Sequence, residues 1–163
     1  MIAWSRGVIG RILSMFRISP MPDRLPVIGF IAPRPKSGVR AQWHAWAAEA
    51  GMKDIAFDIY RAEPCTCPTC TKKTCLLLRL SEMYTLGRMG YALSTELQEA
   101  ALRLIDVPTP EAVRAGKVDT IINRHGVLHG TVLAAEGAGE REIFWKRLIY
   151  WGFQPIADPR MAH

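Results

Sequence analysis

Four cysteines are the residues of this chain whose type and spacing most directly indicate chemistry. They follow the pattern C-x-C-x2-C-x4-C, at Cys65, Cys67, Cys70 and Cys75. Zn²⁺ in structural sites takes four tetrahedral ligands, usually thiolates or imidazoles, and a C-x2-C pair lets two sulfur atoms of one turn reach the same ion. The spacing therefore predicts a structural zinc site, a zinc-knuckle-like loop over residues 65–75 with no open position for catalysis.

Other states of the same cysteines stay open. Cys65 and Cys67 are too close in sequence to pair with good disulfide geometry, and two bridges in so short a segment would be strained and close only short loops. An iron–sulfur cluster also takes four thiolates. Four reduced thiols without a shared role are the remaining alternative.

The positive charge of the chain is concentrated near its N-terminus. Of 163 residues, 21 are Lys or Arg and 15 are Asp or Glu, for a net charge of +6. Residues 1–40 hold seven of the basic residues and one acidic residue, Asp23, so the remainder is neutral. Such a region attracts phosphates or an anionic surface, although a solvated basic face that aids solubility is an equal alternative.

Residues 1–20 are expected to form a basic amphipathic helix, with apolar side chains on one face and Arg6, Arg11 and Arg17 on the other. Such a helix packs on its own domain, docks on a protein partner or lies on a membrane surface. No apolar run reaches the roughly 18 residues of a membrane span, and the arginines interrupt any secretory signal. We therefore expect a cytoplasmic protein with a single domain over residues 24–163.

The first part of that domain has the pattern of a βαβ unit. Pro26–Ala32 and Asp54–Tyr60 read as strands, and the segment between them reads as a helix that ends near Ala50, with Trp43 and Trp46 as core anchors. Two such strands are expected to be parallel with a right-handed crossover.

The loop that precedes this helix is basic. Ser37 is expected to cap the helix, and three cations lie near the helix N-terminus, where βαβ units bind anions: Arg34, Lys36 and Arg40. We therefore treat these three as candidate nucleic-acid- or anion-binding residues. No Walker or Rossmann glycine pattern is present in the sequence, so a nucleotide site is only weakly indicated.

The second half of the chain reads as mostly helical. Leu76–Ile105 has the longest apolar periodicity and predicts a helical stretch with a break near Gly87 and Gly90. Thr109 is expected to cap a short helix that begins at Pro110. Glu140–Trp151 predicts a further helix with a stripe of large side chains: Ile143, Phe144, Arg147, Leu148 and Trp151.

Arg124 and His129 form an R-x4-H pair inside the string N-R-H-G-V-L-H-G at positions 123–130. This string resembles one in HEPN-type proteins of the abortive-infection kind, where it lies on a late helix. The resemblance implies a metal-independent ribonuclease, usually completed by two protomers. In that case His129 would be the general acid or base, Arg124 would stabilise charge on the phosphate, and Asn123 and His125 would orient them.

A β-hairpin is the alternative for the same segment. Residues 117–123 and 127–133 are rich in β-branched and apolar side chains, which would place Arg124-His125-Gly126 at a turn. Gly126 and Gly130 would each cost a helix about 1 kcal/mol. Helix and hairpin both stay open.

Together these patterns predict an α+β fold, a small β-sheet with packed helices and the zinc-knuckle-like loop. The function expected from them is a non-enzymatic, zinc-stapled module that binds nucleic acid or a nucleoprotein complex through its basic N-terminal region. A HEPN-like ribonuclease that uses Arg124 and His129 is one alternative. A small protein-interaction or inhibitor protein, docked through its N-terminal helix, is the other.

Overall fold

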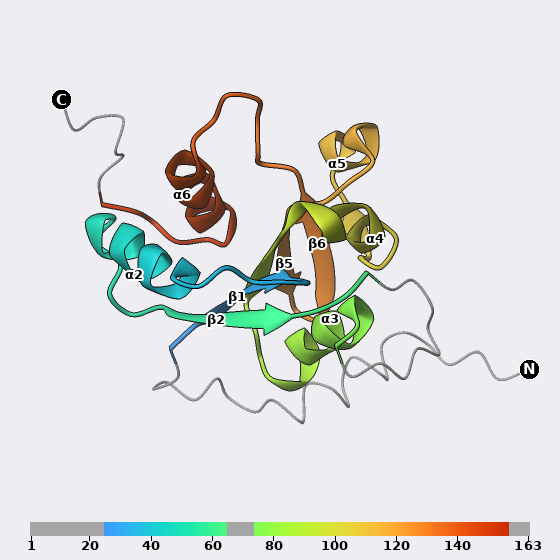
Figure 1. Ribbon diagram of the computed structural model, residues 1–163, viewed down its shortest axis with the longest axis horizontal. Coiled ribbons are helices and arrows are strands. Elements are labelled where there is room, and N and C mark those ends of the chain that lie inside the picture. Colours follow the sequence, from blue (N-terminus) through green and yellow to red (C-terminus); the bar gives the residue numbers. More distant parts are fainter. Residues whose placement is uncertain (1–24, 65–73, 157–163) are drawn as a thin grey trace, which may run out of the picture.

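A mixed six-stranded sheet forms the centre of the computed structural model, which describes residues 25–64 and 74–156 (Figure 1). The strand order is β2-β1-β3-β5-β6-β4. β5 runs antiparallel to both of its neighbours, whereas β2, β1 and β3 are mutually parallel and β4 is parallel to β6. The strands are β1 (Val27–Ala32), β2 (Ala56–Arg61), β3 (Gly90–Leu93), β4 (Val107–Pro108), β5 (Thr120–Arg124) and β6 (Val127–Thr131).

Helices cover both faces of this sheet. On one face lie α2 (Val39–Glu49) and α6 (Glu140–Tyr150), and on the other lie α3 (Leu76–Thr85), α4 (Gln98–Leu102) and α5 (Pro110–Ala115) (Figure 1). A short 3-10 helix, η1 (Thr95–Leu97), precedes α4. The architecture is therefore a three-layered α/β arrangement, and the prediction of an α+β fold with a small sheet is wrong. In the ranges that the structure describes, no helix has the length and apolar character needed to cross a membrane.

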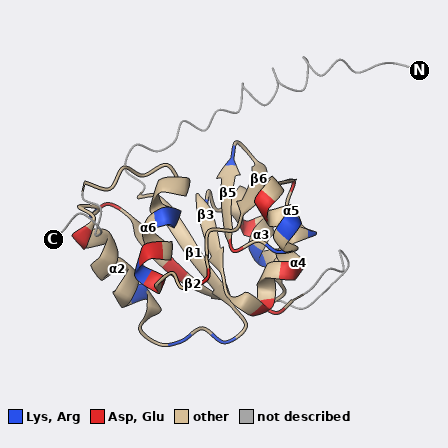
Figure 2. Cartoon of the chain, turned by 90° about the horizontal axis from the view of Figure 1, so that it is seen from above, with Lys and Arg blue, Asp and Glu red and all other residues tan. Residues whose placement is uncertain are grey.

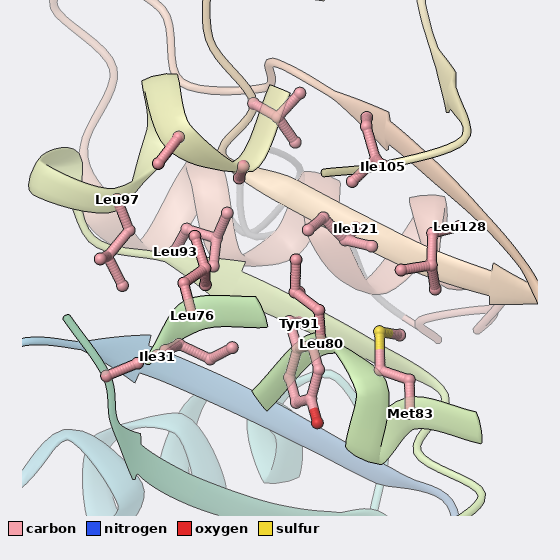
Figure 3. Close-up of a cluster of buried hydrophobic side chains, with 14 of the residues drawn as sticks. Ile31, Leu76, Leu80, Met83, Tyr91, Leu93, Leu97, Ile105, Ile121 and Leu128 are labelled. Atoms are coloured by element: carbon pink, nitrogen blue, oxygen red, sulfur yellow. The ribbon is translucent and has the colours of Figure 1, made fainter. Parts of the chain in front are cut away.

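The core on the α3 side joins both halves of the chain. Leu76, Leu80 and Met83 of α3 pack against Tyr91 of β3, and the Tyr91 hydroxyl donates to the carbonyl oxygen of Arg79 at 2.9 Å (Figure 3). Side chains from β1, β5 and β6 complete this cluster: Ile31, Ile121 and Leu128. These buried contacts join the two halves of the chain.

Aromatic rings dominate the core on the α2 side. Trp43 is buried, and its ring lies 5.5 Å from that of Phe57 and 5.1 Å from that of Phe144, measured between centroids. Trp151 is fully buried and its indole nitrogen donates to the carbonyl oxygen of Ile121 at 3.1 Å. The expectation that Trp43 anchors the core is confirmed.

The β1-α2-β2 unit forms where the sequence predicted it, with the two strands parallel from Val27↔Ala56 to Ala32↔Arg61. Thr109 also caps α5 as expected, since its hydroxyl accepts a hydrogen bond from the amide of Ala112. Ser37 does not cap α2. Gly38 is the residue at that N-cap, in a left-handed conformation, and no side chain bonds to the free amides there.

The predicted helical stretch over Leu76–Ile105 is wrong in its middle. α3 ends at Thr85, and Gly90–Leu93 forms β3, which lies between β1 and β5 with all of its residues buried. A strand covered on both faces shows a continuous apolar run, which does not differ in periodicity from a buried helical turn.

The surroundings of Cys75 contradict the predicted zinc knuckle. Its side chain is only 2% exposed, belongs to the buried core and caps α3, because the sulfur accepts a hydrogen bond from the amide of Leu78 at 3.4 Å. Cys65, Cys67 and Cys70 lie outside the described residues. Within the described ranges no group of three or more His, Cys, Asp or Glu side chains could hold a metal ion. The prediction of a structural zinc is therefore wrong for this part of the chain.

Residues 120–131 form a hairpin and not a helix. β5 pairs with β6 from Thr120↔Thr131 to Arg124↔Val127, and His125 and Gly126 make the two-residue turn with positive φ angles of 54° and 85°. Positive φ at both positions is the signature of a type I′ turn. Because the late helix of HEPN proteins is absent here, the resemblance to that family is wrong.

Candidate ligand-binding cleft

The parallel strands β1 and β3 are neighbours, and the chain leaves their carboxyl ends toward opposite faces of the sheet. After β1 it enters α2 on one face, and after β3 it enters η1 and α4 on the other. Such a switch point leaves a crevice between the two diverging loops, and ligands of open α/β sheets bind there.

A cleft of about 500 Å³ occupies this position. Its walls come from the end of β1 and the following loop, from α2, from the segment after β3, and from α6. The lining combines aromatic and aliphatic side chains with a few polar ones, as small-molecule sites do. The polar and charged residues are Arg34, Lys36, Ser37, Gln42, Ser94, Thr95, Glu96, Gln98, Glu140 and Arg147.

Arg147 reaches the cleft from α6 and is held by buried groups beneath it. Its Nε donates to Oγ1 of Thr120 at 3.0 Å, and the Thr120 hydroxyl donates in turn to Oδ1 of Asp119 at 2.7 Å. Burial lowers the pKa of Arg147, while the charges of Asp119 and Glu140 raise it. The guanidinium stays protonated at any physiological pH, because the ordinary pKa of arginine lies far above that range.

Asp119 is fully buried and organises the segment that follows β6. Its two carboxylate oxygens accept hydrogen bonds from the amide of Leu133 at 3.0 Å, and Oδ2 accepts one from the amide of Ala134 at 2.8 Å. Ala134 itself lines the cleft. One carboxylate therefore fixes both a wall of the cleft and, through Thr120, the cation that projects into it.

The segment after β3 contributes two further polar side chains. Gln98 is buried, and its amide nitrogen donates to the carbonyl oxygen of Leu93 at 3.1 Å. The Ser94 hydroxyl oxygen is buried and lies beside the Glu96 carboxyl. The amide of Glu96 and then Ser94 lower the pKa of Glu96, and Lys36 contributes in the same direction.

The three predicted anion-binding residues separate in the structure. Arg34 and Lys36 line the cleft from the loop after β1. Arg40 lies on α2 and forms an ion pair with Asp58 of β2 at 3.2 Å. The role of these cations in anion binding stays a prediction, with the cleft as the place where two of them would act.

Arg124 and His129 lie at the other end of the sheet. They face the same side of the hairpin, since Arg124 follows Ile122 by two positions and His129 is paired with Ile122. β5 is antiparallel to β3, so this turn lies beside the amino end of β3, away from the cleft. Neither residue lines the cleft.

The sequence interpretation overlooked Ser94, Gln98, Asp119 and Thr120 as site residues. The run Gly90–Leu93, bounded by glycine and Ser94, was a signal for a short buried strand whose following residues reach an edge of the sheet. Arg147 was visible as a cation within an apolar helical stripe, which indicates a charge held at the edge of a core.

The functional prediction of a zinc-stapled module that binds nucleic acid or a nucleoprotein complex is also wrong. The loop cations Arg34 and Lys36 line a concave site that also contains Glu96 and Glu140, in place of a flat basic face. Basic and acidic residues are interspersed along the described helices (Figure 2). The predicted docking helix, residues 1–20, lies outside the described residues.

No protein-family model matches this chain, and no curated protein sequence matches it either. Solved structures do resemble it. Shikimate 5-dehydrogenase from Listeria monocytogenes, in complex with shikimate and NAD, superposes with a TM-score of 0.57 and 20% identity, over 81% of this chain and 40% of that one. 5-Ketofructose reductase of Gluconobacter sp. superposes with a TM-score of 0.55 and 20% identity, over 68% of this chain and 37% of that one.

Shikimate dehydrogenase 1 from Peptoclostridium difficile is similar at a TM-score of 0.52 and 21% identity, over 66% of this chain and 36% of that one. This chain therefore spans well under half the length of each of these neighbours. The likeness overturns the predicted resemblance to HEPN proteins and the predicted fold class. What it establishes is that the mixed six-stranded sheet and its helices have the fold of part of a shikimate dehydrogenase-like enzyme.

Proposed function

We propose that this chain binds a small hydroxylated organic molecule in the cleft at the carboxyl ends of β1 and β3. The observation that supports this most directly is the position of the cleft at the switch point of the sheet. Its volume of about 500 Å³ suits a single-ring compound with polar substituents.

The chemistry of the lining fits such a ligand. Phe30, Trp43 and Trp46 offer apolar surface to the carbon skeleton, while Ser94 and Gln98 offer hydrogen-bonding groups. The structural neighbours are named for shikimate, a cyclic hydroxylated acid, and for 5-ketofructose, a neutral sugar. Both belong to the size and polarity class that the cleft admits.

A nicotinamide dinucleotide, which one neighbour holds with its substrate, does not fit the described residues in the same way. Dinucleotide sites use glycine-rich turns whose backbone amides approach the pyrophosphate. The turn after β1 has Pro33 and Pro35, which lack amide hydrogens, and the sequence has no G-x-G-x-x-G string. We therefore propose binding of the small molecule alone, with no step through a nicotinamide.

The test is titration of the purified chain with shikimate and with 5-ketofructose, followed by isothermal calorimetry. Ala134 is exposed and lines the cleft, whereas the neighbouring Ala135 is exposed and does not. Ala134→Trp should fill the cleft and abolish binding, and the matched variant Ala135→Trp should bind as the unmodified chain does. Absence of binding by both compounds, or equal affinity in both variants, would refute the proposal.

A further inference from the structure

Arg147 is the one guanidinium of the cleft that the fold holds in place from beneath. Arg34, by contrast, is exposed on the loop after β1. Arg147 is partly buried on a helix whose neighbouring residues Phe144, Leu148 and Trp151 are fully buried. Withdrawing a guanidinium from water is costly unless it gains partners, so its presence in this stripe requires an explanation.

The contacts of Arg147 leave its outer nitrogens free for a ligand. Nε is committed to Thr120, which is itself oriented by Asp119. Among the described residues no carboxylate lies within ion-pair distance of the guanidinium. The Asp119 oxygens are occupied by the Leu133 and Ala134 amides and by the Thr120 hydroxyl.

We propose that Arg147 recognises an acidic group of the ligand, so that the cleft selects a molecule with a carboxylate over a neutral sugar. This inference rests on the proposed function and names the class of ligand. A guanidinium with both outer nitrogens free binds a carboxylate through two parallel hydrogen bonds, which a hydroxyl cannot match.

The other charges of the cleft favour a single negative charge over a phosphate dianion. Glu96 and Glu140 line the same space as Arg147, and like charges repel at short range. The buried Ser94 hydroxyl is a further polar group in this lining, beside the Glu96 carboxyl. One carboxylate with hydroxyl groups elsewhere on the molecule matches this distribution.

The experiment compares three probes on three variants by calorimetry. The probes are shikimate, its methyl ester and 5-ketofructose. The variants are Arg147→Gln, Arg147→Lys and the matched control Arg141→Gln, which changes an exposed arginine of the same helix that does not line the cleft. Loss of a charge-assisted pair costs roughly 10- to 100-fold in affinity. We expect Arg147→Gln to lose that much affinity for shikimate alone, Arg147→Lys to lose less, and Arg141→Gln to change little.

Several outcomes would overturn the assignment and leave the proposed function intact. They are shikimate binding unchanged in Arg147→Gln, an equal or greater loss in Arg141→Gln than in Arg147→Gln, or 5-ketofructose and the ester binding the unmodified chain as tightly as shikimate does. If no probe binds the unmodified chain, both proposals fail together. Circular dichroism checks folding, and should Arg147→Gln unfold, Arg147→Lys decides the comparison, since full retention of shikimate affinity there contradicts recognition by the planar guanidinium.

Discussion

The two ends of the sheet use polar residues in opposite ways. At the cleft end, where β1 and β3 finish, Arg147, Thr120 and Asp119 form a chain of contacts that begins in a buried carboxylate and ends in a cavity. At the hairpin end, the Asn123 side chain bonds to the backbone of the fold. Its Oδ1 accepts from the amide of Gly126 in the turn at 2.8 Å, and its Nδ2 donates to the carbonyl oxygen of Met83 in α3 at 3.2 Å.

The difference shows why a string of chemically suggestive residues is a weak guide to a site. Residues 123–130 contain an asparagine, an arginine and two histidines, yet the asparagine closes a turn and His125 occupies it. The cleft residues and the two residues that support Arg147 have no shared motif, since they come from positions 94, 98 and 147 and from positions 119 and 120. Parallel strands bring such separate loop ends to one edge, which is the reason that sites in α/β proteins gather there.

The largest effect is expected from removing the buried carboxylate at the cleft end. Asp119→Ala would leave the amides of Leu133 and Ala134 without their acceptor, so we expect about 3–5 kcal/mol of destabilisation. Asp106 at the hairpin end is the matched control, because it accepts from the amide of Leu128 but is exposed. Asp106→Ala should cost about 1 kcal/mol. Urea unfolding measures both, and equal losses would contradict the contrast between the ends.

Gly126→Ala tests whether residues 120–131 form a hairpin or a helix, because its effect on stability has opposite signs in the two. A left-handed residue with a Cβ costs about 1–2 kcal/mol, and a Cβ at Gly126 would meet only ordinary contacts with Tyr84, so the loss would come from backbone conformation. In a helix the same change would stabilise by about 1 kcal/mol. His125→Asn should raise stability slightly, since Asn-Gly suits a type I′ turn. Thermal unfolding of both variants decides the sign.

Tyr91 lies in the core beneath both ends and gives the fold a dependence on high pH. Burial raises the pKa of Tyr91 well above its ordinary value of about 10. The folded-state pKa is the higher one, so the contribution is complete below pH 10 and is lost above it, as the unfolded chain ionises first. Tyr91→Phe should cost about 1 kcal/mol at pH 7, from the lost bond to Arg79.

The measurement is urea unfolding of both proteins between pH 7 and 11. The difference in free energy of unfolding between the unmodified chain and Tyr91→Phe should narrow above pH 10. A gap that widens with pH would show that the Tyr91 hydroxyl is not buried in the way described.

The smallest effect is expected for the R-x4-H pair. Arg124 is exposed at the end of β5, and His129 is half-buried on β6. His129→Ala and Arg124→Ala should each change stability by about 0.5 kcal/mol or less and leave shikimate affinity unchanged. Calorimetry on both variants checks this, and a tenfold loss of affinity in either would place the hairpin end in the site.

Local patterns in the sequence were sufficient to predict several helices and strands. Alternating and β-branched residues predicted β1 and β2, Thr109 and Pro110 predicted the start of α5, and the stripe from Ile143 to Trp151 predicted α6. Each depends on contacts between residues a few positions apart. The short buried strand β3 was missed, because four apolar residues fit a strand and a helix equally well.

By itself, the sequence determined the elements whose capping, turn chemistry and periodicity are local, and it named Arg34 and Lys36 as cations near a helix start. Only the tertiary structure decided that the strand order is β2-β1-β3-β5-β6-β4 and that Ser94, Asp119 and Arg147 converge. These residues are separated by 25 or more positions, and no local pattern encodes their proximity. It follows from the burial of both faces of one sheet, which forces the crossovers that bring the three segments to the same edge.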